Sequence, residues 1–145
     1  MRRIHAKIFC VNDERDPLDL FDFIVTQGGH QTVRALGAAE AHRKIVQERT
    51  LDLAIINLLM PMSDWPEPVE LNYKTNLQAG FIIARFLRAK FKGIPIIFDS
   101  ASSTYLPESL ALASSFPNSC YLKNPFHVHD LLAKINLALE GKPFS

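Results

Sequence analysis

The chain has 145 residues, of which 48% are hydrophobic, and a formal net charge of +1 at pH 7. This length buries one sizeable core but is short for two ordinary domains, so we expect a single domain over residues 1–145. The small net charge gives no overall field that would attract nucleic acid or an acidic membrane surface. We therefore expect no nucleic-acid partner. No continuous apolar stretch suits a signal peptide or a transmembrane helix, so we also expect no membrane partner.

The two cysteines, Cys10 and Cys120, lie within or just before apolar, strand-like runs rather than in a spaced framework. Free, buried thiols in a reducing compartment explain this placement more simply than a disulfide does. We therefore expect a cytoplasmic protein.

The first half of the chain alternates short apolar runs with stretches of helical period. Residues 7–11 form a nearly unbroken apolar run, which is typical of a strand covered on both faces in a parallel sheet. Apolar residues then recur at helical spacing over 18–25, and Gly28 and Gly29 provide a stop. The pattern continues with a strand over 32–36, a helix over 38–47 and a strand over 51–57.

The second half repeats this alternation. An apolar stripe with basic residues outside it begins at Gly80 and predicts a third helix. Residues 94–98 favour a fourth strand, with Pro95 near its start, where a missing N–H costs least. The remaining elements are a helix over 106–115, a strand over 120–122 and an amphipathic helix over 128–139. Five strands alternating with five helices predict an α/β fold, a doubly wound parallel sheet in three α/β/α layers.

Polar residues follow the carboxyl ends of the predicted strands, where ligands of open α/β sheets bind. The third strand ends in Asn57. A carboxamide has no ionisable group and is a poor nucleophile, so it cannot form the acyl phosphate that phosphoryl transfer to a side chain requires. The other residues at these ends are Asn12, Asp13 and Glu14 after the first strand, Asp99, Ser100 and Ala101 after the fourth, and Lys123, Asn124, Pro125 and Phe126 after the fifth.

The ordered set of motifs resembles the receiver domain of bacterial two-component response regulators. The resemblance covers nearly the whole chain and implies a flavodoxin-like sheet with strand order 2-1-3-4-5. It also implies a role in signal transduction. The positions that agree with the family pattern are Asp13, Met60 with Pro61, Gly80, Ser100 with Ala101, Tyr121, and Pro125 with Phe126.

Three positions depart from the family pattern. Asn12 stands where the first acid of a pair is usual, Asn57 where the phosphoacceptor aspartate is usual, and Asn124 where a lysine is usual. Lys123 is adjacent, but side chains alternate along a strand, so it should point away from the pocket that residue 124 faces. Three such changes favour natural divergence over a single engineered substitution.

These changes also weaken any magnesium site that the resemblance implies. Mg²⁺ prefers hard oxygen ligands and is usually held through one or two carboxylates. Asp13 alone, with Glu14 nearby, would hold the ion weakly, and the missing lysine removes the charge that steadies a transferring phosphoryl group. We expect no catalytic residue, no enzymatic activity, and no cofactor beyond weakly bound Mg²⁺.

The resemblance further implies switch positions and partners. Ser100 and Tyr121 stand at the family's switch positions, although Ser100 would also suit the capping of a turn. The expected partner is a signalling protein such as a histidine kinase or an output protein. Partners of the family commonly bind the surface that corresponds here to residues 106–115, 121–123 and 127–139, and a homodimer would form through the fourth helix.

An insertion at about residues 62–79 separates the Met-Pro pair from the third helix. Loops longer than about a dozen residues in compact domains are usually functional or disordered. Trp65 and Tyr73 are rigid aromatic residues of the kind that dominate interfaces, which favours a lid or a docking arm. A surface loop whose Trp65 packs on its own domain is an equally weighted alternative.

Three hypotheses for the function follow. The first is a phosphorylation-independent protein-interaction module built on an atypical receiver domain. The second is a pocket for a small anionic ligand, held by backbone amides after Asn57 and by hydroxyls after the fourth strand, with the 62–79 loop as a lid. The third is a receiver that is phosphorylated on a displaced acid: Asp13, Asp64 or Asp99.

Overall fold

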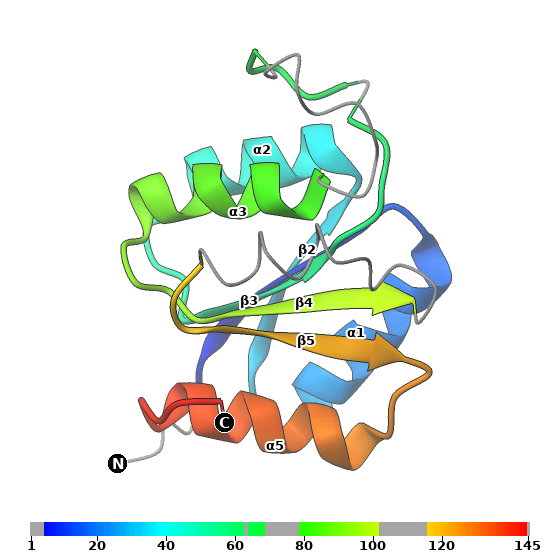
Figure 1. The fold of residues 1–145 in the computed structure, drawn as a ribbon, viewed down its shortest axis with the longest axis vertical. Coiled ribbons are helices and arrows are strands. Elements are labelled where there is room, and N and C mark those ends of the chain that lie inside the picture. The colour runs from blue at the N-terminus through cyan, green and yellow to red at the C-terminus, as the bar shows by residue number, and fades with distance from the viewer. Residues whose placement is uncertain (1–4, 63, 69–78, 102–115, 145) are drawn as a thin grey trace.

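The structure is a computed structural model that describes residues 5–62, 64–68, 79–101 and 116–144. Five parallel strands form one sheet in the order β2-β1-β3-β4-β5, which confirms the predicted doubly wound topology. Figure 1 shows α2 and α3 on one face of this sheet and α1 and α5 on the other. The elements are β1 (Lys7–Asn12), α1 (Arg15–Gln27), β2 (Gln31–Leu36), α2 (Ala38–Gln47), β3 (Leu53–Asn57), α3 (Ala79–Lys90), β4 (Ile96–Ala101), β5 (Ser119–Asn124) and α5 (Val128–Leu139).

Four of the five predicted helices lie within the described residues. The other was predicted over 106–115, and this segment lies outside the described residues. The closing helix was predicted at its observed bounds, 128–139, because its apolar residues keep helical spacing throughout.

All five strands differ from their predicted bounds, by one to three residues at an end, and β3 and β4 show how pairing sets these ends. β3 begins at Leu53 instead of residue 51, because its pairing with β1 begins there. At the preceding residue, the Asp52 N–H donates to the Lys7 carbonyl, and the Lys7 N–H donates to the Asp52 carboxylate, both at 2.8 Å. β4 extends past Phe98 to Ala101 because it is paired along its length with β5. Hydrogen bonding to neighbouring strands, which the sequence pattern does not contain, sets these ends.

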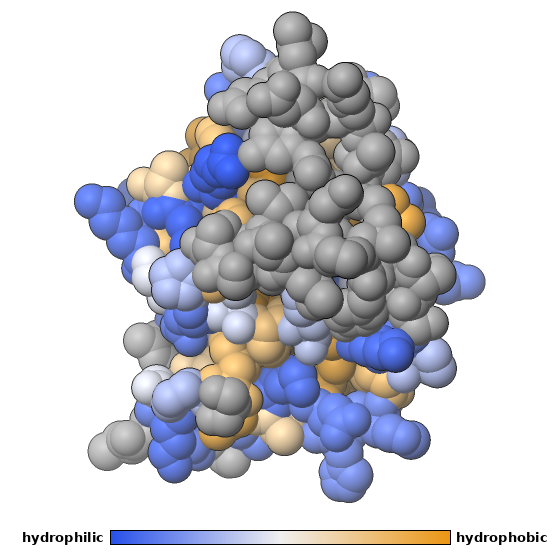
Figure 2. Space-filling view, viewed as in Figure 1, coloured by the Kyte–Doolittle hydropathy of each residue, from blue (hydrophilic) through white to orange (hydrophobic). Residues whose placement is uncertain are grey.

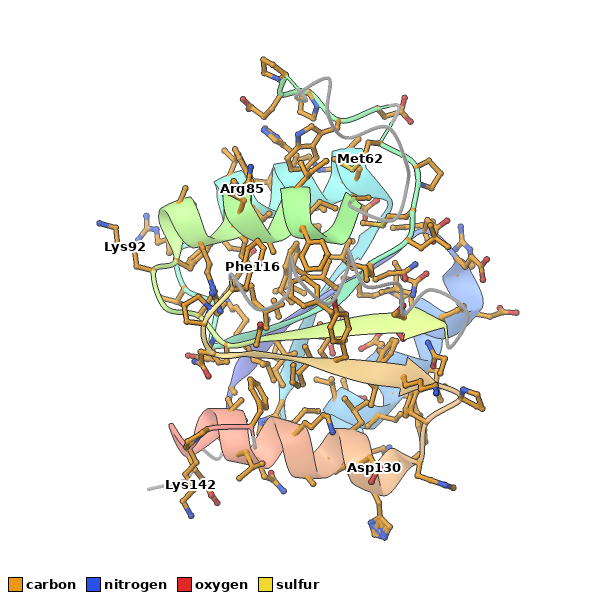
Figure 3. The ribbon with its side chains drawn as sticks, viewed as in Figure 1. Met62, Arg85, Lys92, Phe116, Asp130 and Lys142 are labelled. Atoms are coloured by element: carbon orange, nitrogen blue, oxygen red, sulfur yellow. The ribbon has the colours of Figure 1, made fainter. Side chains whose placement is uncertain are left out.

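A hydrophobic core lies on each face of the sheet. On the side of α2 and α3, Phe81 packs against Phe98 with ring centroids 4.8 Å apart, and Phe116 stacks on Phe81 at 5.5 Å. Figure 3 shows Phe116 beneath α3, facing the sheet. On the other side, Phe21 of α1 stacks on Phe126 at 5.4 Å. The sheet is thus buried on both faces, as the unbroken apolar strands predict.

Gly80 lets α3 begin in direct contact with the end of β3. Its N–H donates to the Leu58 carbonyl at 3.0 Å. A Cβ at this position would lie 2.7 Å from the Leu58 Cα and 2.9 Å from the Asn57 carbonyl oxygen, which is closer than packed atoms approach. The absence of a side chain at Gly80 therefore helps to fix the backbone that carries Asn57.

Both cysteines are free thiols; Cys10 is buried and Cys120 is half-buried. Burial raises the pKa of the Cys120 thiol to about 11 and raises that of Cys10 further. Within the described ranges, no helix is both long and apolar enough to cross a membrane. Figure 2 shows a mixed surface, with hydrophilic residues along the α5 edge and hydrophobic residues exposed just above it.

Candidate functional site

The candidate site is a cavity of about 630 Å³ at the carboxyl ends of β1, β3, β4 and β5. Figure 1 shows the arrowheads of β4 and β5 pointing toward this end of the sheet. Ligands of open α/β sheets bind at this edge because the strand ends and the loops that follow them meet there. The polar lining residues are Asn12, Asp13, Glu14, Asp16, Asn57, Asp99 and Asn124, and the apolar ones are Pro17, Leu20, Phe21, Leu59, Met60, Pro61 and Phe126.

The carboxamide of Asn57 acts as a hydrogen-bond donor in this cavity. Its Nδ2 donates to Asp13 Oδ1 and to the Leu59 carbonyl, each at 3.0 Å. A carboxylate at residue 57 has no proton to donate at neutral pH, so it would lose both bonds and face Asp13 with like charge. Asn57 thus ties the acid after β1 to the loop after β3.

Asp99 is the centre of a second set of hydrogen bonds. Its side chain is only 2% exposed. Asn12 Nδ2 donates to Asp99 Oδ2 at 3.4 Å, and Asn124 Nδ2 donates to Asp99 Oδ1. Asn12 is itself buried, and its Oδ1 accepts the Glu14 N–H at 3.0 Å. Carboxamides from β1 and β5 therefore hold the carboxylate that β4 supplies.

Burial raises the pKa of Asp99 to about 6, and the hydrogen bond from Asn124 opposes that rise. At neutral pH the buried Asp99 carboxyl is mostly ionised, and the amides of Asn12 and Asn124 donate to it. Desolvation outweighs the hydrogen bond from Asn124, since the pKa of Asp99 stays above its ordinary value of 3.8.

The central position of Asp99 in the cavity was not predicted from the sequence. Asp99 was one of several residues expected after the fourth strand, and the switch position was assigned to Ser100. Asp99 lines the cavity, whereas Ser100 is buried and lies outside the lining, because adjacent side chains of a strand point to opposite sides. An acid directly after the apolar run Ile96 to Phe98 was the available signal.

The remaining site candidates divide between the cavity and other parts of the molecule. Asn124 lines the cavity and Lys123 does not; Lys123 is exposed. Tyr121 is half-buried against the core beside α3, with its ring centroid 6.1 Å from that of Phe98. Tyr73 lies outside the described residues.

Trp65 packs onto α2 and α3, and it does not line the cavity. Trp65 is 8% exposed, and its ring meets His42 and Phe86 edge-on, with centroids 5.1 and 5.3 Å away. His42 Nε2 lies 2.7 Å from Glu67 Oε2, which ties the same segment to α2. Figure 3 places Met62, which begins the insertion, beside these two helices. For its described residues, the insertion follows the alternative in which Trp65 anchors the loop to its own domain.

The cavity residues do not fit the Mg²⁺ ion that the resemblance implies. Asp13 already accepts from Asn57, and both oxygens of Asp99 accept from carboxamides. In the part of the chain that the structure describes, no three His, Cys, Asp or Glu side chains are grouped to hold a metal ion. Mg²⁺ would have to displace these amide donors to gain oxygen ligands.

Solved structures with a similar backbone identify the fold. A response regulator receiver domain protein from Clostridium thermocellum matches with a TM-score of 0.74 and 21% identity, over 94% of this chain and 95% of that one. The chain has the receiver fold. The signal receiver domain of a signal transduction histidine kinase from Syntrophus aciditrophicus matches with a TM-score of 0.72 and 21% identity, covering 94% and 91%. A response regulator receiver protein from Sinorhizobium medicae gives 0.68 and 19%, covering 94% and 93%.

The receiver fold that the ordered motifs predicted is thus confirmed at the level of architecture. The sequence matches no family model. The three asparagines at positions 12, 57 and 124 are features of this sequence, and they set the chemistry of the cavity on that shared architecture.

Proposed function

We propose that this chain is a receiver domain of two-component signalling that works as a protein-interaction module without being phosphorylated. The observation that carries the proposal is the carboxamide of Asn57 at the end of β3, where it donates to Asp13 instead of offering a nucleophilic oxygen. A carboxamide cannot form an acyl phosphate under these conditions. The single domain would therefore signal by binding.

The carboxamide network supports a fixed state of the cavity. Asn57 donates to Asp13, and Asn12 and Asn124 donate to Asp99, so the acids are held without a cation or a phosphoryl group. Phosphorylation normally shifts a population between two conformations. With hydrogen bonds holding one arrangement, the module is constitutive, or it responds to a binding partner.

A displaced phosphoacceptor is disfavoured by the same geometry. Asp99 is buried, and its oxygens accept amide hydrogens. Asp13 is exposed but accepts from Asn57, and Asp64 is exposed outside the cavity lining. None of these carboxylates combines access, a free oxygen and a neighbouring positive charge, which stabilise a phosphoryl group during transfer.

An anionic ligand is disfavoured by charge. The cavity lining contains four acids, and no Lys, Arg or His belongs to it among the described residues. Coulomb repulsion would oppose an anion there, most strongly at the buried Asp99. The backbone amides after Asn57 are also in use, since the Leu59 N–H donates weakly to Asn57 Oδ1 at 3.4 Å and the Leu58 N–H donates to the Asp99 carbonyl at 2.9 Å.

A signalling protein is the partner class that fits this proposal. One solved relative in fold is the receiver domain of a histidine kinase, and others are response regulators. A histidine kinase or an output protein is accordingly the expected partner. The proposed dimer surface on the fourth predicted helix lies outside the described residues.

The test is intact mass after incubation with acetyl phosphate and Mg²⁺. Wild-type chain is expected to gain no phosphoryl mass. The matched variant Asn12→Asp, Asn57→Asp, Asn124→Lys restores the acids and the lysine of the family pattern and is expected to gain one. Labelling of the wild type would contradict the proposal, because a nucleophile other than Asn57 would then be active. A triple variant that stays unmodified would contradict the receiver origin of the cavity.

A further inference from the structure

The side of the molecule formed by α2 and α3 carries positive charge along α3. Residues 79–95 include two Arg and two Lys, and no Asp or Glu. Arg85, Lys90 and Lys92 are exposed. Figure 3 shows Arg85 beside the two helices and Lys92 beyond the end of α3. Arg43, whose side chain is 59% exposed, adds a positive charge from α2.

Successive turns of α2 and α3 meet along one line of contact. Figure 1 shows the two helices side by side on one face of the sheet. His42 stacks on Phe86, with ring centroids 4.6 Å apart. One helical turn later, Lys90 Nζ donates to the Val46 carbonyl at 2.8 Å. Residues four apart lie on the same side of a helix, so the second pair continues the surface that the first pair begins.

The first of these two turns is covered by the chain's own insertion. Trp65 is 8% exposed, and its ring meets those of His42 and Phe86 edge-on. His42 Nε2 lies 2.7 Å from Glu67 Oε2. The segment that packs on this turn therefore presents an apolar ring and, two residues later, an acid.

The second turn exposes an apolar side chain beside positive charges. Val46 is 56% exposed. Arg43 precedes it by three residues, which places both on the same side of α2. Lys90 donates to the carbonyls of Ile45 and Val46, which holds its ammonium group beside this turn. An occupant would need an apolar side chain to cover Val46 and carboxylates to meet the cations, which is the chemistry that Trp65 and Glu67 present one turn earlier.

We infer that this second turn is a docking surface for a segment of a partner protein that carries an apolar side chain together with Asp or Glu. This inference rests on the proposed function as an interaction module. The surface, called here the basic docking surface, consists of Arg43, Val46, Arg85 and Lys90. The apolar side chain of the partner covers Val46, and its carboxylates lie beside the basic groups.

The composition of this side favours an acidic protein segment over a nucleic acid. Phosphate groups would use only the cations and leave Val46 uncovered. Carboxylates also lie nearby, since Glu40 Oε2 is 3.8 Å from Arg43 Nη2 and Glu48 Oε1 is 2.9 Å from Lys7 Nζ. The long, exposed contact between Glu40 and Arg43 contributes little, so a carboxylate of a partner can replace it.

The test is a titration of the ¹⁵N-labelled full chain with matched peptides, followed by NMR. The peptides are acetyl-Trp-Leu-Glu-Glu-Leu-Glu-amide, the same peptide with Lys for Glu, and the same peptide with Ala for Trp and Leu. The Glu-Leu peptide is expected to shift the amide resonances of residues 42–49 and 85–92, and to bind at least about fivefold more weakly at high salt. The Lys peptide is expected to leave these resonances unchanged, and the Ala peptide to bind more weakly.

Variants locate the binding on the basic docking surface. Val46→Gln, and separately Arg43→Gln with Arg85→Gln, are each expected to weaken the Glu-Leu peptide at least about fivefold. The substituted side chains are exposed, and the ¹⁵N spectrum of each variant reports its fold. The matched controls lie across the sheet: Val128→Gln at the start of α5, where Val128 is 48% exposed, and Lys142→Gln after that helix.

Four outcomes would overturn the inference: no binding, equal binding of the Glu and Lys peptides, equal sensitivity to the control variants, or displacement of the Glu-Leu peptide by a single-stranded oligothymidylate. The last outcome would identify the surface as a site for nucleic acid instead. None of these outcomes bears on the proposed function, which fails only in the acetyl phosphate experiment.

Discussion

Asn57 reverses the hydrogen-bonding role of its position: the side chain that ends β3 donates to Asp13 where a carboxylate would repel it. The exchange of one oxygen for an NH2 group removes a nucleophile and adds a stabilising contact. Asn12 and Asn124 each donate to Asp99. The three carboxamides therefore act as the counterparts of two acids in a cavity without basic side chains in its described lining.

Asn57→Asp alone is expected to destabilise the fold. The variant loses two hydrogen bonds and places a carboxylate beside Asp13, at an expected cost of about 1–3 kcal/mol in the free energy of unfolding at pH 7. The cost shrinks at acidic pH, where the new carboxyl is protonated. Urea denaturation at both pH values measures this. Equal stability of variant and wild type at pH 7 would contradict the role given to the amide donor.

Asp99 gives the fold a pH dependence of defined sign. Its pKa is about 6 in the folded chain, against an ordinary value of 3.8, so the folded state holds its proton to higher pH than the unfolded state. Stability from this group is therefore fully present below pH 3.8 and is lost as the pH rises through 6. The loss is at most about 3 kcal/mol, from about 1.4 kcal/mol per pKa unit.

Asp99→Asn removes this titration and is expected to flatten the stability curve over that interval. The new amide faces the amide donors of Asn12 and Asn124, which lowers stability at every pH, so the slope is the informative quantity. Urea unfolding of wild type and variant at several pH values between 4 and 7 measures both slopes. Parallel curves would show that another group carries the pH dependence.

At the residue scale, the sequence predicted the departures from the receiver pattern but not their consequences. Asn12, Asn57 and Asn124 were each located at the site from strand order alone. That they donate to acids could not be predicted, because hydrogen bonds between strands depend on side-chain orientation. Asp99 was assigned little weight for the same reason: strand alternation decides whether it or Ser100 faces the cavity, and the bounds of β4 were shifted in the prediction.

At the element scale, the start of α3 controls the position of the end of β3. Gly80→Ala is expected to destabilise the chain by about 1–3 kcal/mol, because the added methyl group meets the Leu58 and Asn57 backbone, and that cost exceeds the helix-propensity gain of about 1 kcal/mol. Gly28→Ala is the matched control, since its φ of −77° and its nearest contacts at 3.4 Å accept a Cβ. Urea midpoints compare the two. Equal effects would contradict the close approach at Gly80.

The segment 64–68 is attached to α2 and α3 by Trp65 and by the contact between His42 and Glu67. Trp65→Ala is expected to lower the free energy of unfolding by about 3 kcal/mol, as deletion of a buried ring does. Circular dichroism during urea unfolding measures this loss. A variant as stable as the wild type would contradict the anchoring of this segment by Trp65.

Element identity and the bounds of α2 and α5 were predictable from the sequence, while the ends of the strands were not. The unbroken apolar run at residues 7–11 and the helical spacing over 128–139 were each strong enough to decide the element type. The start of β3 differs from the prediction at Asp52, whose side chain accepts the Lys7 N–H. The end of β4 differs because β4 pairs with β5 as far as Ala101. These contacts link residues far apart in sequence, which local periodicity does not report.

At the scale of the whole molecule, the receiver architecture and the chemistry of the cavity are separable. The parallel order β2-β1-β3-β4-β5 brings four strand ends to one edge, and it would do so with acids or with amides at those ends. The doubly wound fold was predicted from the alternation of strands and helices, and its strand order was predicted from the resemblance to receiver domains. The sign of charge in the cavity required the three-dimensional lining, which joins Asp16 of α1 to Asp99 of β4.

The claim that this receiver fold signals without phosphorylation is tested most directly by the ¹⁵N spectrum of the wild-type chain before and after acetyl phosphate and Mg²⁺. The spectrum reports a covalent adduct and a conformational shift together. We predict that the resonances of Asn57, Asp99 and Tyr121 stay in place, because the Asn57 carboxamide cannot form an acyl phosphate and the carboxamides already donate to Asp13 and Asp99. Shifts at these residues that persist after removal of acetyl phosphate would contradict the account.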